Sequence, residues 1–401
     1  PDQWLTPASD PMSPLLRWDL PPQLQPARHL PPSIPLLYST AMANGGLSVF
    51  DDNEIRLGAD LIGSAFWLLT RYEELTNHAR DEHDRFAADD SRLFGEGVLL
   101  QPLVNVYADV LWETLLLLWP GLRRRRRAYA VRLTCDVDNP FGAYRRTPLR
   151  VARSVGTDVF IRRDAGLALR RIGAYGLTRW GKPEWDVNDT YDLLMDTCEE
   201  HGFDSTFFFQ AGKERVGSAI SSDPMLGLLR RIGDRGHEIG LHPTYNTYRD
   251  EERLREEFDQ LRLACRRAGV PQTEFGGRQH SLQRENPTTW RLYESVGLAN
   301  DSTLSFADHY GFRTGSCFDY PVFDLEQRRP LKIREQPLLV MEGTILSYMG
   351  EDLDRFVERS VALADTVRAY DGTLSRLWLN HNLVSRGLRR ELRVLAEGIA
   401  P

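Results

Sequence analysis

The chain has 401 residues, of which 41% are hydrophobic and 27% are charged, and its formal net charge is -7. These values are typical of a globular protein and exclude a disordered, collagen-like or disulfide-scaffold chain, and the lack of excess positive charge argues against nucleic acid as a partner. The cysteines are widely spaced without a CxxC pair, which indicates reduced thiols and no thiolate zinc site; they are Cys135, Cys198, Cys265 and Cys317.

Two observations bear on membranes and location. The sequence begins at Pro1 without a charged and then apolar signal segment, which favours a cytoplasmic location. The most apolar stretch runs from Val110 to Trp119, contains Glu113 and ends at Pro120. It is too short to cross a bilayer and predicts a buried helix.

The first 127 residues predict an extended arm followed by a smaller, mainly helical domain. Prolines recur through the first forty residues and fix many backbone angles without helical periodicity. Apolar residues at three- and four-residue spacing then predict helices over Ala59–Leu75 and Leu103–Leu118. We interpret the run Arg123–Arg127 as an exposed linker, so the expected domains are residues 1–127 and 128–401.

From Tyr129 onward, strand-like and helical patterns alternate. The strand-like runs cover residues 129–134, 205–209, 237–242, 274–280, 332–341 and 376–381. The helical patterns cover residues 190–201, 225–235, 252–268, 288–296 and 353–370. This order predicts an α/β fold with a parallel sheet or barrel, in which polar residues that end the strands gather at one face.

Two carboxylates end the first of these strands. The two-residue repeat of a strand places Asp136 and Asp138 on the same side of the chain. A bound cation would relieve their repulsion, or one of them would be poised as a base. An Asp-rich turn closed by Asn139 and Pro140 is the structural alternative.

A histidine and a carboxamide end the third strand-like run. His242 precedes Asn246 by four residues, a spacing that suits two ligands on one turn. Together with a carboxylate from another strand, His242 would form a nitrogen and oxygen site of the kind that zinc occupies with a position left for water. We expect His237, on the same strand, to be structural.

Polar groups also end three later strands, within Gly276–His280, Asn300–Thr303 and Leu377–Asn382. Each alone fits a capped helix or a buried polar group as well as it fits catalysis. Their joint placement at the ends of strands favours a catalytic site.

The order of these motifs resembles that of the NodB-like polysaccharide deacetylases, which hydrolyse N-acetyl groups with a divalent metal. The resemblance extends from about Tyr129 to the C-terminus and implies a distorted (β/α) barrel. It depends on Thr134-Cys135-Asp136-Val137-Asp138 and, most closely, on Gly236 to Asn246. The segment Ala59–Arg71 resembles a branch of the family in which a helical domain precedes the barrel.

The resemblance also implies a role for each site residue. Asp136 would be the general base, and Asp138 and His242 metal ligands. Asn246 stands where the family has its second histidine ligand, and His280 is an alternative third ligand. Oxygen of an asparagine binds a borderline metal more weakly than imidazole does.

The remaining roles concern the acid and the partner of the base. Arg278 would pair with the base, and His381 would be the general acid with Asp301 raising its pKa. The implied cofactor is a divalent metal, with Zn²⁺ preferred.

The resulting functional prediction is a metal-dependent hydrolase that removes N-acetyl groups from an amino sugar of a surface polysaccharide or its precursor. Two alternatives stay open. One is a non-catalytic carbohydrate-binding relative with a degenerate metal site, raised by Asn246. The other is a metal-dependent hydrolase of a different bond, because one fold supports many substrates.

The stretch from Asn139 to Lys182 has an uneven charge, with nine arginines and only Asp158 and Asp164 as acids. We hypothesise that it contacts an anionic glycan, a diphosphate-linked sugar carrier or, peripherally, an acidic membrane surface. A set of solvated, arginine-rich helices explains it equally well.

Overall fold

The computed structural model describes residues 15–24, 30–37, 49–50, 54–144, 146–161, 163–212 and 219–401. Much of the predicted proline-rich arm, as well as Arg145 and Arg162 in the arginine-rich stretch, lies outside the described residues.

The N-terminal region is mainly helical, as expected. Its strands form two small antiparallel pairs, β1 (Leu16–Asp19) with β2 (Ser33–Leu36) and β3 (Val49–Phe50) with β4 (Ile55–Arg56). Its helices are η2 (Pro22–Leu24), α1 (Leu61–Leu69), α2 (Glu73–Thr76), α3 (Arg92–Gly95) and α4 (Leu103–Leu118). The single helix predicted over Ala59–Leu75 is wrong, because Arg71 adopts a left-handed backbone with φ of 54° and separates α1 from α2.

One nine-stranded sheet forms the larger part of the molecule. Its order is β10-β11-β9-β8-β7-β6-β5-β13-β12, and every pairing except that of β10 with β11 is parallel. The strands are β5 (Ala130–Val137), β6 (Asp204–Phe209), β7 (Glu238–Leu241), β8 (Gly276–Gly277), β9 (Asn300–Asp301), β10 (Tyr320–Asp324), β11 (Arg329–Glu335), β12 (Val340–Met341) and β13 (Thr373–Leu377).

The sheet curls into a barrel-like form. Gln336 donates its backbone N–H to Asp301 beside β9 (2.7 Å), and Leu339, three residues later, donates to Ser375 on β13 (3.0 Å). Three extended residues span at most about 11 Å. In a flat sheet the five intervals between β9 and β13 would span about 24 Å. The two ends of the sheet must therefore approach each other, which confirms the predicted distorted α/β barrel.

This crossing also corrects one predicted strand. The run Lys332–Met341 is divided into β11 and β12, because residues 336–339 pass from one edge of the sheet to the other. The strand predicted over Glu274–His280 is shortened to β8, after which the chain turns into η6 (His280–Leu282).

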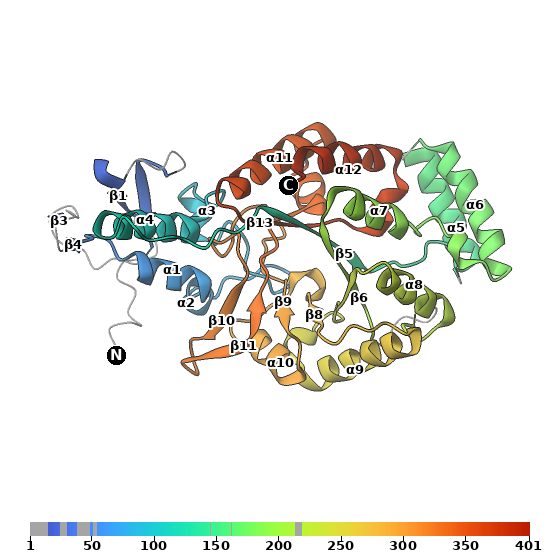
Figure 1. Ribbon diagram of the computed structural model, residues 1–401. Coiled ribbons are helices and arrows are strands. Elements are labelled where there is room, and N and C mark those ends of the chain that lie inside the picture. The colour runs from blue at the N-terminus through green and yellow to red at the C-terminus, as the bar shows by residue number, and fades with distance from the viewer. Residues whose placement is uncertain are drawn as a thin grey trace.

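Figure 1 shows the helices of this part of the chain, of which α7 to α12 lie around the sheet, whereas α5 and α6 lie at one end of the molecule. They are α5 (Pro148–Gly156), η3 (Thr157–Ile161), α6 (Ala165–Arg179), η4 (Pro183–Trp185), α7 (Tyr191–His201), α8 (Asp223–Asp234), η5 (Thr247–Arg249), α9 (Glu251–Ala268), α10 (Thr288–Val296), η7 (Thr344–Tyr348), α11 (Leu353–Ala369), η8 (Asn380–Val384) and α12 (Arg386–Ile399). Sequence signals set their ends: in α9 the Asp250 side chain accepts from the N–H of Arg253, and Gly269 ends the helix with φ of 78°.

Two hydrophobic cores result. The main core packs the strands against their helices and contains the fully buried Trp290 and Trp378. The second core belongs to the N-terminal region and includes Trp18 and Tyr107, with Phe306 contributed by the later part of the chain. The boundary at residue 127 stays a prediction.

Candidate metal centre

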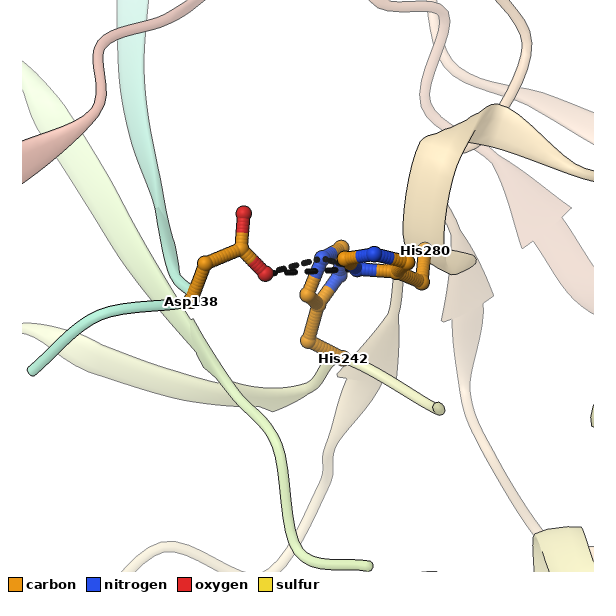
Figure 2. Close-up of side chains that lie close together, drawn as sticks. All are labelled: Asp138, His242 and His280. Carbon is orange, nitrogen blue, oxygen red and sulfur yellow. Dashed lines mark hydrogen bonds and ion pairs between the residues drawn. The ribbon is translucent and has the colours of Figure 1, made fainter. Parts of the chain in front are cut away.

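Three side chains converge at the carboxyl ends of neighbouring strands (Figure 2). Asp138 follows β5, His242 follows β7, and His280 opens η6 after β8. Parallel strands place their carboxyl ends at one edge, so residues more than a hundred positions apart in the sequence meet here. One ligand atom from each lies within 4.8 Å of the others.

The geometry and chemistry of this cluster fit a divalent cation. Asp138 Oδ1 lies 3.4 Å from His242 Nε2 and 3.2 Å from His280 Nδ1, and the two nitrogens are 3.1 Å apart. Ligands at about 2.0–2.1 Å from a tetrahedral zinc ion are separated by roughly 3.3–3.4 Å. Two imidazoles and one carboxylate are also a donor set that zinc accepts.

A second contact orients His242. Its Nδ1 lies 2.6 Å from the backbone oxygen of Arg278, which can only accept a hydrogen bond. Nδ1 therefore carries the proton and donates it, which leaves the Nε2 lone pair directed at the cluster in the neutral ring. The residue is buried, so its ring is also fixed by packing.

The pKa values of the cluster show that protons and a cation compete for it. Burial by itself raises the pKa of Asp138, but hydrogen bonds from His242 and His280 outweigh it and hold that pKa well below its usual range. Burial likewise lowers the pKa of His242, but Asp136 and Asp138 outweigh it and raise that pKa. A cation at the same atoms would replace the proton in this role.

Asp136 lies beside the cluster and is held by Arg278. Asp136 Oδ1 accepts from Arg278 Nη1 (3.1 Å), while Oδ2 is 3.9 Å from His242 Nε2. Arg278 is fully buried and donates also to Thr134 Oγ1 (2.7 Å), Ser302 Oγ (2.8 Å) and the backbone oxygen of Ser302 (2.9 Å). Its guanidinium is thus fixed beside Asp136, in the pairing that the family resemblance implied. The role of Asp136 as a base stays a prediction.

Asn246 has its own contacts with Gln283. Its side-chain oxygen accepts from Gln283 Nε2 (3.4 Å), its backbone N–H donates to Gln283 Oε1 (2.9 Å), and its backbone is left-handed with φ of 70°. The structure places His280, the alternative third ligand, with Asp138 and His242. Whether Asn246 also contributes a ligand stays a prediction.

His381 and Asp301 occupy two further strand ends. His381 is on η8, directly after β13, the neighbour of β5 in the sheet. Asp301 is fully buried, and its Oδ1 accepts from the backbone N–H of Thr303 (3.0 Å). Burial raises the pKa of Asp301 and, together with the Asp301 charge, raises that of Glu335. The effect of Asp301 on His381 stays a prediction.

The sequence reasoning did not single out Gln210 and Glu342. Gln210 Nε2 donates to Asp138 Oδ1 (2.8 Å) and lies 3.0 Å from His280 Nδ1. Glu342 Oε1 accepts from the N–H of Leu379 (2.6 Å) and from Asn382 Nδ2 (3.0 Å), on either side of His381. Both residues directly follow strands, at Phe209 and Met341, so the rule that selected Asp136 would have selected them.

The N-terminal region touches the edge of the site. His83 Nδ1 lies 3.0 Å from the hydroxyl of Tyr245, whose ring is beside that of His280. Arg85 donates to the backbone oxygen of Ser281 (3.3 Å), next to His280. This region therefore supports the loops that carry the ligands.

Comparison with known proteins gives one family match and several similar solved structures. A protein family described as a family of unknown function (DUF7033) matches residues 19–120 of the sequence. Searching the curated proteins gives no match. Similar solved structures include a protein described as a polysaccharide deacetylase from Mycobacterium smegmatis, with 18% identity over 70% of this chain and 86% of that chain and a TM-score of 0.45.

Two further solved structures cover the same share of this chain. Puue allantoinase is 15% identical over 70% of this chain and 85% of its own, with a TM-score of 0.42. A protein described as a polysaccharide deacetylase from Pseudomonas aeruginosa PAO1 is 14% identical over 70% and 86%, with a TM-score of 0.41. At such low identities and TM-scores, these similarities do not assign a function to the chain.

Proposed function

We propose that the chain is a divalent-metal-dependent hydrolase that removes N-acetyl groups from an amino sugar of a surface polysaccharide or its precursor. One observation carries the proposal: the triad of Asp138, His242 and His280 lies beside Asp136, which is fixed by a buried arginine. A metal site can activate water and polarise the amide carbonyl, and a positioned carboxylate can take the proton of that water.

The cation would be bound by the three clustered side chains, where it would act as a Lewis acid toward water and the acetyl carbonyl, and zinc suits this donor set. The other side chains move and hold protons. Asp136 takes a proton from the attacking water as the new C–O bond forms, and Arg278 keeps its carboxylate in one orientation.

The second half of the reaction requires an acid, because an amine leaves poorly unless it is protonated. His381 gives a proton to the amide nitrogen as the C–N bond breaks, which yields acetate and the free amino sugar. Glu342 acts as a positioning residue, since it binds the chain on both sides of His381.

The contacts of His280 bear on the non-catalytic alternative. That alternative was raised by asparagine at position 246, which weakens a site made of Asp138, His242 and Asn246. His280 offers an imidazole beside Asp138 and His242, which supports a site able to bind metal without Asn246.

Metal content and acetate release, measured together, test the proposal. We expect the wild type to contain stoichiometric metal and to release acetate from N-acetylated amino sugars, and we expect Asp138→Ala and His242→Ala to lose both. His237→Ala is the matched control, because His237 precedes β7 and contacts Ser205 and Glu199 instead of the cluster.

Two results would contradict the proposal. A wild type that stays free of metal after incubation with zinc would favour the binding-protein alternative. Metal-dependent cleavage of phosphoesters or cyclic amides without acetate release would show that the bond is a different one.

A further inference from the structure

The arginine-rich stretch forms a helical hairpin that the catalytic site does not use. It consists of α5 with its extension η3, a turn, and α6, and it is inserted between β5 and α7. Figure 1 shows it at one end of the molecule, with the N-terminal helices at the other end. Any function of the hairpin therefore depends on its own exposed side chains.

The hairpin is a built element with its own interior. Asp158 and Arg171 are both buried and form an ion pair of 2.6 Å between η3 and α6. At the base, the buried Asp186 accepts from the backbone N–H groups of residues 142–144 at 2.6–2.8 Å, which ties the start and the end of the insertion together. Its exposed side chains are therefore held in defined positions.

Large apolar side chains are exposed on the outer surface of this hairpin. Phe160 is 83% exposed and Ile161 77% exposed at the turn, and Trp180 is 84% exposed at the end of α6. Leu169 and Ile172 are also exposed on α6. Leu169 and Ile172 are spaced by three residues, which places them on one face of α6, and Trp180 directly follows the helix.

Exposed arginines flank these apolar side chains. Those on the hairpin are Arg150, Arg153, Arg163, Arg170 and Arg179. Helix α12 adds Arg386, Arg390 and Arg393 beside α6, and burial followed by the charges of Arg170 and Arg393 lowers the pKa of Arg389. Asp158 is already paired, and Asp164 caps α6. The surface is thus strongly positive.

We propose that this hairpin docks on the surface of a membrane that contains anionic lipid. Arginines would contact the lipid phosphates, while Phe160, Ile161 and Trp180 would enter the boundary between headgroups and acyl chains, as aromatic and aliphatic side chains do in peripheral proteins. A soluble anionic glycan would engage the arginines but leave the exposed apolar side chains unexplained. A second copy of the chain would bring two arginine-rich surfaces together, which their repulsion opposes.

The proposal concerns attachment from one side. No helix among the described residues has the length and apolar character to span a bilayer. Membrane docking by the hairpin does not depend on the proposed deacetylation, so it can be tested whether or not acetate is released.

Flotation with lipid vesicles tests the proposal. We expect the wild type to float with vesicles of phosphatidylcholine and phosphatidylglycerol, but not with phosphatidylcholine alone. Arg153→Glu with Arg170→Glu should weaken binding by at least about 25-fold, at roughly fivefold per arginine. Phe160→Ser with Ile161→Ser and Trp180→Ser should remove the binding that persists at high salt, because salt screens the arginines but not apolar insertion.

Matched controls change the same properties elsewhere. Arg123→Glu with Arg125→Glu reverses two exposed charges, and Ile62→Ser with Trp119→Ser removes exposed apolar groups near the other end of the molecule. These controls should float like the wild type. Each variant should keep the wild-type thermal unfolding midpoint, which separates lost docking from lost folding.

Three outcomes would overturn the proposal. The first is a wild type that does not float with the anionic vesicles. The second is an equal loss in the hairpin variants and the controls. The third is a wild-type dimer, seen by analytical ultracentrifugation, that the hairpin substitutions dissociate, which would identify a second copy as the occupant.

Discussion

Two clusters of charged side chains in this molecule are superficially alike. One is the triad of Asp138, His242 and His280 at the strand ends. The other lies between the N-terminal region and the barrel, where Glu74 accepts from Arg71 (2.8 Å), Arg313 (2.7 Å) and Arg284 (3.2 Å). In the second cluster three arginines surround one carboxylate, so the protein itself supplies the positive charge that Glu74 requires.

The triad differs in what its members present to each other. Imidazole nitrogens and a carboxylate oxygen point at one small space, and these atoms are compatible only if a proton or a cation lies between them. A cluster that lacks its own cation is suited to binding one, whereas a cluster whose carboxylate is already paired with arginines is suited to holding two parts of the chain together. This distinction separates a candidate site from a structural ion network without reference to relatives.

The largest expected effect is the loss of both metal and activity, and it tests whether His280 or Asn246 is the third metal ligand. His280→Ala should remove bound metal and activity, because two remaining ligands hold zinc poorly. Asn246→Ala should leave metal content near the wild-type level, since Asn246 is bound to Gln283. The measurement is elemental analysis after dialysis against a weak chelator. Metal retained by His280→Ala but lost by Asn246→Ala would reverse the assignment.

A second prediction separates the base from the ligands. Asp136→Asn should lower kcat by about a hundred- to ten-thousand-fold while metal stays bound, because this change removes a proton acceptor but none of the three clustered donors. Asp138→Asn, two residues along the same strand end, should lower metal content as well. If Asp136→Asn lost metal as readily as Asp138→Asn, then Asp136 would be a ligand and the base would lie elsewhere.

Local signals in the sequence were enough to predict the α/β barrel and the strand ends that carry the site. The alternation of strands and helices and the polar residues after each strand depend on local periodicity and on the geometry of parallel sheets. The residues alone therefore singled out Asp136, Asp138 and His242, whereas His280 as a ligand and Arg278 as the partner of Asp136 were implied by the family resemblance.

Long-range contacts were harder to predict. The turn into η6, which brings His280 to the cluster, and the contact of Asn246 with Gln283 are not encoded by any local pattern. The division of the predicted strand over Lys332–Met341 depends on closure of the barrel, which no local pattern encodes. Likewise, no local pattern predicts that the left-handed backbone at Arg71 interrupts the expected helix. The Arg71 side chain contacts Glu74 and the barrel.

The smallest of these effects concerns the second cluster. Glu74→Gln should lower the free energy of unfolding by about 3–5 kcal/mol at neutral pH, because it removes the carboxylate that three buried arginines contact. The exposed Glu252→Gln on α9 is the control and should leave the unfolding midpoint unchanged. Urea unfolding of both variants and the wild type measures the difference.

The pH dependence of this difference has a definite sign. Burial by itself raises the pKa of Glu74, but Arg313, Arg71 and Arg284 outweigh it and hold that pKa well below its ordinary value of 4.5. The stabilisation by the Glu74 charge is therefore fully present above pH 4.5 and declines as the pH falls toward the folded-state pKa. The advantage of the wild type over Glu74→Gln should shrink correspondingly in acid. An advantage that was constant from neutral pH to pH 3 would mean that packing, and not charge, makes this cluster stabilising, and the contrast with the triad would then fail.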